Sequence, residues 1–178
     1  MICAAIDPGA SGGLAYINLD SGTVFTQKMP ETTKDICLAL SDFKRRNAFI
    51  ILEAQHARPS GIIHRKNPQT GADEYAPMRG SVASWTFAQH YGELRGLLVA
   101  LEIPFVEMKP KDWMKASGIR PKGKTEKQTQ WKNFLKEKAQ ERFPGTKVTL
   151  AVADALLMCA LCHRLFGRAK KADPFEDI

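Results

Sequence analysis

A chain of 178 residues, 44% of them hydrophobic, is long enough to bury the core of one globular domain. Lys and Arg total 26 against 19 Asp and Glu, and the resulting formal charge of +7 favours an anionic partner, above all nucleic acid. No stretch approaches the roughly 20 apolar residues of a membrane span, and the first residues lack the basic and apolar segments of a secretion leader. Composition therefore predicts an intracellular protein with no membrane partner.

The chain opens with an apolar strand that ends in a carboxylate. Residues 2–6 are apolar, Asp7 follows, and a glycine-rich turn from Pro8 to Gly13 leads into a second apolar strand. The glycines allow a tight turn and leave room for a ligand phosphate. A buried carboxylate is costly unless hydrogen bonds or a cation compensate, so Asp7 is a candidate metal ligand. The alternative is an ordinary hairpin with an incidental Asp at its turn.

The next segments extend this hairpin into a larger sheet. Residues 24–28 predict a third strand and thus a three-stranded meander. A helix capped by Thr32 or Thr33 then crosses the sheet to a continuous apolar run, residues 48–52, which closes on Glu53. Such a run is typical of a central strand buried on both faces. Glu53 therefore repeats the pattern of Asp7.

A polar segment from Ala54 to Gly80 is too long for an ordinary connector, and we expect a functional or disordered loop. A helix is predicted to follow, beginning near Ser81 or Ser84. Its apolar residues recur at spacings of four, three, four and three: Phe87, Tyr91, Leu94, Leu98 and Leu101. This stripe fits core packing within the monomer and, equally, a dimer interface.

A basic run follows the predicted strand at residues 104–108. Between Lys109 and Lys138, ten Lys or Arg stand against three Asp or Glu, with two Trp interleaved. Pro110 opens a short helix in this run, and the sequence from Thr125 to Gln128 matches a capping box for a helix that ends at Phe143. The run predicts a phosphate-binding surface, and the alternative is a solvated helix face.

The last predicted helix is apolar from Leu150 onward but carries one acid, Asp154, near its start. Cys159 and Cys162 in this helix have zinc-like spacing, yet no second Cys/His pair stands at a suitable distance. We therefore expect buried thiols in the core. A charged tail at 168–178 follows a single domain at 1–167.

Three acids thus occupy positions where an unpaired carboxylate would be expensive: Asp7, Glu53 and Asp154. If the strands at 2–7 and 48–53 lie side by side, their acids converge at one edge, and a late helix packed there adds Asp154. Such a cluster repels itself without cations. Mg²⁺ takes oxygen ligands and keeps waters that can act on phosphate, and two ions stabilise the attacking and leaving oxygens together. We therefore predict these acids as catalytic ligands of Mg²⁺, for which Mn²⁺ would substitute.

Five segments, in their order and spacing, resemble the RuvC-type Holliday-junction resolvases of the RNase H-like superfamily, particularly the phage-borne branch. They are Ile6-Asp7-Pro8-Gly9, Leu52-Glu53, the Gly80 to Gly96 stretch, Lys109-Pro110-Lys111-Asp112-Trp113 and Ala153-Asp154-Ala155-Leu156-Leu157. The resemblance implies an α/β, RNase H-like fold with a mixed five-stranded sheet flanked by helices on both faces. It also implies a cytoplasmic homodimer, in a bacterial or phage-infected cell, that resolves four-way DNA junctions by paired symmetric nicks.

The resemblance implies further site residues. Gln55, His56 and Arg58 would lie near the junction centre. The lysines expected to contact the DNA backbone are Lys109, Lys111, Lys115, Lys122 and Lys124. The family often has another Asp or His one helical turn before the last Asp, where this chain has Ala151. Either the site works natively with three carboxylates plus water or a group such as Thr149, or an acid was replaced there by Ala to trap uncleaved DNA.

Two other functions remain open. Sugar kinases and actin-like ATPases share the fold and an Asp-Gly-rich first hairpin that cradles nucleotide phosphates, but two such domains enclose their nucleotide, and this length provides one. A nucleotide-dependent thermal shift would identify that function. A non-catalytic branched-DNA-binding protein would retain the basic run, and metal-dependent cleavage of labelled junctions separates it from an enzyme.

Overall fold

The computed structural model describes residues 1–54, 62–67, 69–77 and 81–167. Its strands are β1 (Ile2–Asp7), β2 (Gly13–Asn18), β3 (Val24–Lys28), β4 (Ala48–Glu53), β5 (Ile62–Lys66), β6 (Asp73–Pro77) and β7 (Phe105–Met108). Its helices are α1 (Thr33–Arg45), α2 (Ser81–Ala100), α3 (Pro110–Ala116), α4 (Gln128–Arg142) and α5 (Ala153–Phe166). One sheet has the strand order β3-β2-β1-β4-β7, and β5 pairs with β6 apart from it.

The five-stranded sheet is mixed, as predicted. Strands β1, β2 and β3 form an antiparallel meander, whereas β4 pairs in parallel with β1 on one side and β7 on the other. Helix α1 makes the crossing from β3 to β4. Its N-cap is Thr32, whose side chain accepts a hydrogen bond from the Asp35 N–H at 3.1 Å, and Lys44 and Arg45 lie in its last turn.

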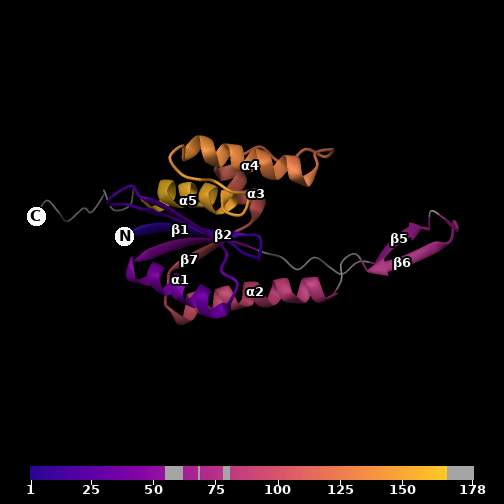
Figure 1. Ribbon diagram of the computed structural model, residues 1–178, viewed down its shortest axis with the longest axis horizontal. Helices are drawn as coiled ribbons and strands as arrows, with labels where there is room; N and C mark the ends of the chain where they lie inside the picture. The colour runs from indigo at the N-terminus through magenta and orange to yellow at the C-terminus, as the bar shows by residue number, and fades with distance from the viewer. Residues whose placement is uncertain (55–61, 68, 78–80, 168–178) are drawn as a thin grey trace, which may run out of the picture.

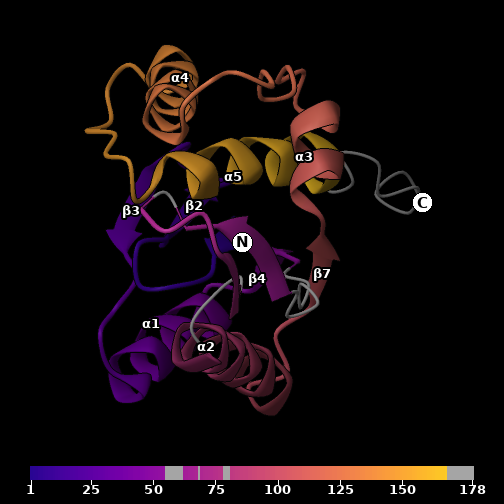
Figure 2. The same cartoon turned by 90° about the vertical axis from the view of Figure 1, so that its right-hand side faces the viewer.

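Helices cover both faces of this sheet, with α1 and α2 on one side and α3, α4 and α5 on the other (Figure 1, Figure 2). Successive side chains of β1 lie on opposite faces of the sheet. Cys3 and Ala5 pack in the core under α5, whereas Ile2, Ala4 and Ile6 pack in the core under α1 and α2. Since both faces are buried, the strand is apolar at nearly every position. The predicted fold class is confirmed.

Helix α5 lies in the core but begins later than predicted. It starts at Ala153 rather than Leu150, because the preceding residues form a turn in which the Val152 N–H donates to the Thr149 carbonyl at 3.3 Å. Cys159 and Cys162 are fully buried, and the Cys159 thiol donates to the Cys3 carbonyl oxygen at 3.1 Å. Their predicted role in core packing is confirmed.

The polar segment from Ala54 to Gly80, expected to be a functional or disordered loop, contains a β-hairpin that the sequence did not predict. Strands β5 and β6 pair antiparallel, and the Asn67 side chain accepts the N–H groups of Gln69 and Thr70 at 2.8 and 3.1 Å in the turn between them. The hairpin projects away from the sheet (Figure 1). Its strands show no regular alternation of apolar and polar residues, so the sequence pattern did not reveal them.

Two helices differ from their predicted form. The prediction of a capping box at Thr125 is wrong. Helix α4 begins at Gln128 with Lys127 as its N-cap, and the Gln130 side chain accepts the Lys127 N–H at 3.0 Å. The apolar stripe of α2 is buried only in its second half, where Leu94 is fully buried. Within the described residues, none of the helices has both the length and the hydropathy needed to cross a bilayer.

Candidate active site

Asp7 and Glu53 end two neighbouring parallel strands. β1 and β4 pair in register from Ile2 opposite Ala48 to Ile6 opposite Leu52, so each strand continues directly into its acid. Parallel strands bring their carboxyl ends to the same edge of a sheet. Asp154 reaches this edge from the first turn of α5, which packs on β1 and β2, and the positive end of the helix dipole favours a carboxylate there.

The three carboxylates interact electrostatically. Burial raises the pKa of the Asp7 carboxyl well above its usual range, and the nearby charges of Glu53 and Asp154 raise this pKa further. Burial also raises the pKa of Asp154 to about 6. No hydrogen bond or ion pair joins the Asp7 or Asp154 carboxylate to any residue that the structure describes. A bound cation would relieve this unfavourable arrangement.

Glu53 is fixed by a residue whose role the sequence reasoning missed. Its side chain is 8% exposed, and its Oε2 accepts a hydrogen bond from Nε1 of Trp113 at 3.2 Å. Trp113 lies in α3 and is fully buried, so its indole holds one carboxylate oxygen in a defined orientation. The sequence indicated Trp113 only as an aromatic residue within a basic helix.

Helix α2 supports the turn that follows Asp7. Gly9 has a φ of +102°, and its N–H donates to Nδ1 of His90 at 3.3 Å. A Cβ atom at Gly9 would lie 3.2 Å from the Phe87 ring, and one at Gly12 would lie 2.1 Å from the Asp7 carbonyl oxygen. The glycine at position 12 is therefore needed for the turn itself, because the backbone of Asp7 occupies the space a side chain would take.

Lys132 is a second residue that the sequence reasoning did not single out. It is half-buried in α4, next to Trp131, and its positive charge lowers the pKa values of both Asp7 and Asp154, opposing the effect of burial. It forms no ion pair within 4 Å in the described part of the chain. Its charge therefore reaches the acids without neutralising them. Nothing in the pattern of the ten basic residues distinguishes Lys132, whose charge acts on Asp7 and Asp154, from the others.

The lysines predicted to contact DNA are all exposed: Lys109, Lys111, Lys115, Lys122 and Lys124. Met108 pairs with Glu53 across β7 and β4, so Lys109, which precedes α3, lies beside the acid edge. Gln55, His56 and Arg58 lie outside the described residues, and their predicted position near a junction stays a prediction.

Ala151 lies near the acids but not where the sequence placed it. Because α5 begins at Ala153, Ala151 belongs to the preceding turn and does not share a helical face with Asp154. Its carbonyl oxygen would lie 2.7 Å from a Cβ at Gly13, and Gly13 is the residue opposite Asp7 in the β1–β2 ladder. The backbone of Ala151 therefore packs directly against the strand partner of Asp7.

The residues present fit Mg²⁺. The donors are oxygen atoms, and two of the three acids are largely buried without a partner among the described residues. Within that part of the chain, no three His, Cys, Asp or Glu side chains converge as a ready-made metal cage. The oxygen donors therefore match the ligand preference of Mg²⁺, but the three acids are not preassembled around it, and retained waters would complete its coordination.

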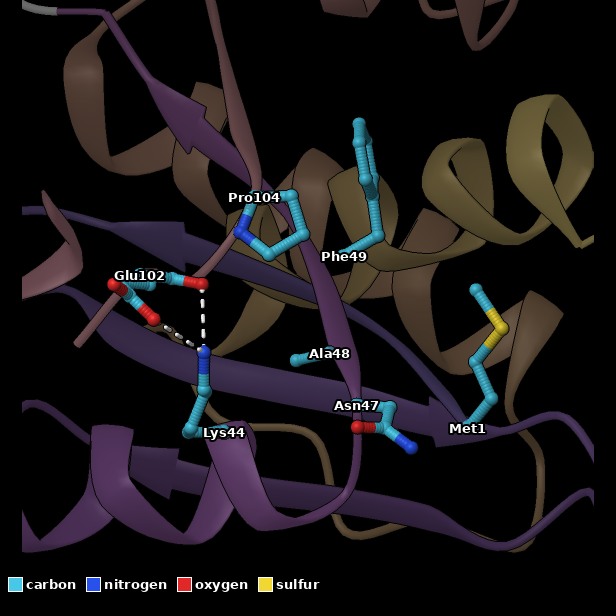
Figure 3. A pocket seen from close by; sticks show the side chains of 7 residues that line it. All are labelled: Met1, Lys44, Asn47, Ala48, Phe49, Glu102 and Pro104. Carbon is cyan, nitrogen blue, oxygen red and sulfur yellow. Dashed lines mark hydrogen bonds and ion pairs between the residues drawn. The ribbon is translucent and has the colours of Figure 1, made fainter.

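A hollow of about 260 Å³ lies at the opposite edge of the sheet and is separate from the acids. Its lining consists of Met1, Lys44, Asn47, Ala48, Phe49, Glu102 and Pro104 (Figure 3). At one side of this hollow, Lys44 Nζ donates a hydrogen bond to the Glu102 carbonyl oxygen at 3.0 Å. Ala48 begins β4 and Glu53 ends it, so the hollow is about 17 Å from the acids at 3.3 Å per residue.

Comparisons with known proteins identify the fold. No protein-family model matches this chain, and no curated protein matches it in sequence. A structure of Thermus thermophilus RuvC is similar, with 16% identity over 96% of each chain and a TM-score of 0.53. T. thermophilus RuvC in complex with a Holliday junction substrate matches at 15% identity over 97% of each chain, also with a TM-score of 0.53. The chain therefore has a RuvC-like fold, the RNase H-like α/β architecture that its sequence predicts.

Proposed function

We propose that this protein is a metal-dependent, structure-selective DNA endonuclease that resolves four-way junctions by paired symmetric nicks. The observation that carries the proposal is the meeting of Asp7, Glu53 and Asp154 at one edge of a RuvC-like sheet, beside exposed lysines. One of the similar structures is RuvC bound to a Holliday junction substrate, and the proposal extends that class of substrate to this chain.

In this mechanism Asp7, Glu53 and Asp154 would hold the metal ions. Bound Mg²⁺ would supply activation of a water and stabilisation of the attacking and leaving oxygens of the phosphodiester. Trp113 orients one oxygen of Glu53 by its hydrogen bond. Lys132 supplies positive charge to the non-bridging oxygens of the phosphate, where negative charge develops in the transition state.

The exposed lysines around this edge bind the flanking phosphates. Lys109 follows the strand partner of Glu53, and Lys111 and Lys115 continue along α3. Contacts from flexible ammonium groups to phosphates give affinity and salt dependence without base readout. Selectivity for a junction then comes from the shape of the DNA and from the spacing of two active sites.

We infer a twofold dimer, because two scissile strands related by junction symmetry need two equivalent active sites. Helix α2 supports this inference. The relevant residues lie on a different face of the helix from the apolar stripe that begins at Phe87. Exposed residues that are small or apolar recur along it every three or four positions: Trp85, Ala88, Gly92, Gly96 and Val99. The exposed fractions of Trp85 and Val99 are 72% and 67%, whereas Leu94 and Leu98 on the other stripe are fully buried. A helix that is apolar on two sides is typical of one that packs against two partners.

Sedimentation at micromolar concentration, with and without four-way DNA, tests the dimer. A dimer in either condition supports it, and monomer in both removes it. Gly96→Glu would place a charge in the exposed stripe of α2 and should dissociate the dimer, whereas Arg95→Gln beside it should not.

The nuclease itself is tested with purified protein and Mg²⁺ or Mn²⁺ on four-way, three-way, flap and linear DNA. Paired nicks at symmetric positions of the four-way substrate are the expected result. Equal cleavage of linear duplex would contradict selectivity for structure.

A non-catalytic branched-DNA-binding protein is the second candidate. Ala151 favours it, because the resemblance leads us to look for a further metal ligand there. Tight binding of four-way DNA without cleavage in either metal would establish this function instead.

A further inference from the structure

The loop between α3 and α4 is closed on itself by an ion pair. Both terminal nitrogens of Arg120 donate to the Glu126 carboxylate, one to each oxygen at 2.9 Å. Glu126 Oε2 also accepts the Gly123 N–H at 3.0 Å, and Arg120 donates to the Pro121 carbonyl at 3.1 Å. These bonds tie the two ends of the segment to each other and to its middle.

This ion pair is attached to the body of the protein through aromatic rings. The Arg120 guanidinium lies 4.2 Å from the centre of the Phe134 ring and 5.3 Å from that of Trp131. These two rings stack on each other at 5.3 Å, and Trp131 belongs to the core cluster under α4 and α5. The loop is therefore positioned relative to α4 and does not simply extend into solvent.

Glu126 stays ionised in this setting. Arg120 and, to a smaller extent, the Gly123 N–H lower the pKa of Glu126 to about 2. Glu126 is one of only three acids in the basic run from Lys109 to Lys138, and a negative charge there repels DNA. Its contribution must therefore be to structure and not to charge.

The loop presents lysines that are free to bind anions. Lys122, Lys124 and Lys127 are exposed and form no ion pair with any described residue. Lys127 is the N-cap of α4 and stands five residues before Lys132, about 7.5 Å along the helix axis. The charge of Lys132 reaches Asp7 and Asp154, so the loop begins the helix that carries this positive charge to the acid site.

We propose that Arg120 and Glu126 form a clip that holds Lys122, Lys124 and Lys127 in one arrangement, ready to bind phosphates of the DNA backbone beside the site of cleavage. The inference rests on the proposed function and deepens it by naming the residues that position the DNA. Arg120 and Glu126 are positioning residues. A segment that is already ordered loses less conformational entropy on binding than a free loop, and the difference appears as affinity.

Two variants that remove the same charge give opposite predictions. Glu126→Gln removes the charge of the clip and one of its two acceptor oxygens, so the forked ion pair with Arg120 is lost, whereas Glu137→Gln removes an exposed carboxylate of α4 in the same basic run. Charge alone would make both variants bind four-way DNA more tightly. The clip predicts that Glu126→Gln weakens binding about three- to tenfold, while Glu137→Gln binds as tightly as the parent or more so.

Arg120→Lys gives a test at constant charge. Lysine retains the positive charge but cannot bond both oxygens of Glu126 in a fork, so binding should weaken as in Glu126→Gln. Hydrogen exchange at the Gly123 amide provides a readout without DNA: slow in the parent and in Glu137→Gln, fast in Glu126→Gln. Unchanged exchange in Glu126→Gln, equal tightening by both Glu variants, or parent-like binding by Arg120→Lys would each overturn the clip.

The same measurements separate the clip from the proposed function. A parent protein that binds DNA but cuts none in Mg²⁺ overturns the nuclease, and the binding comparison still decides the clip. A parent protein that binds no DNA overturns both.

Discussion

Replacing Asp154 by Asn should stabilise the metal-free protein. The pKa of Asp154 is about 6 in the folded chain, compared with 3.8 for an ordinary aspartate. The folded state therefore binds this proton more tightly than the unfolded state, and stability falls as pH rises from about 4 to about 6. Above that range the difference of about two pKa units corresponds to about 3 kcal/mol of lost stability. An asparagine side chain carries no charge, so Asp154→Asn should recover up to about 3 kcal/mol at pH 7.5.

The assay is urea unfolding followed by tryptophan fluorescence, with EDTA present, at pH 7.5 and pH 4. The gain from Asp154→Asn should be large at pH 7.5 and small at pH 4, where the native aspartate is mostly protonated in the folded state. Glu137→Gln, which changes an exposed carboxylate, serves as the control and should change stability by less than about 0.5 kcal/mol at either pH. Mg²⁺ should stabilise the parent and not Asp154→Asn. Equal stability of parent and Asp154→Asn at pH 7.5 in EDTA would refute the electrostatic account of the site.

Two further substitutions test the surroundings of the acids. Ala151→Asp adds a carboxylate beside the strand partner of Asp7, and if a fourth ligand belongs there, junction cleavage in Mg²⁺ should rise strongly. Equal or lower cleavage would instead indicate a native three-acid site. Changing Lys111 and Lys115 together to Gln should weaken binding to all DNA sequences alike and reduce the salt slope by about 0.9 for each lost contact. A loss confined to one sequence would point to base readout.

Most of the sheet and the placement of the acids were predictable because each follows from local pattern plus one rule of topology. The apolar runs before Asp7 and Glu53 indicate strands buried on both faces, and parallel pairing then brings their carboxyl ends together. The crossing helix between them was readable from its N-cap at Thr32 and from the basic residues at its end.

The contacts around the acids could not be predicted because they join residues far apart in the sequence. Trp113 bonds to Glu53 across 60 positions, and His90 to Gly9 across 81. Nothing in the local sequence distinguishes Lys132 from other lysines of the basic run. The capping-box pattern at Thr125 misled because a second pair lies two residues later, where the Gln130 side chain accepts the Lys127 N–H at the observed start of α4.

The first residue of α5, the helix that carries Asp154, could not be predicted either. The apolar pattern of this helix extends back to Leu150, but the residues from Thr149 to Val152 form a turn, and the Ala151 carbonyl oxygen packs close to Gly13. An apolar run defines the existence of a helix better than its first residue. Ala151 therefore lies in the turn before α5 and not on the helical face of Asp154.

The most direct test of the central claim is cleavage of a labelled four-way junction by the parent protein and by Asp7→Asn in Mg²⁺. The parent should nick two opposing strands at symmetric positions. Asp7→Asn should bind the junction as tightly as the parent, or more tightly because a negative charge facing phosphate is lost, and should cut it orders of magnitude more slowly. Cleavage by Asp7→Asn at the parental rate would contradict the assignment of the acid cluster as the active site.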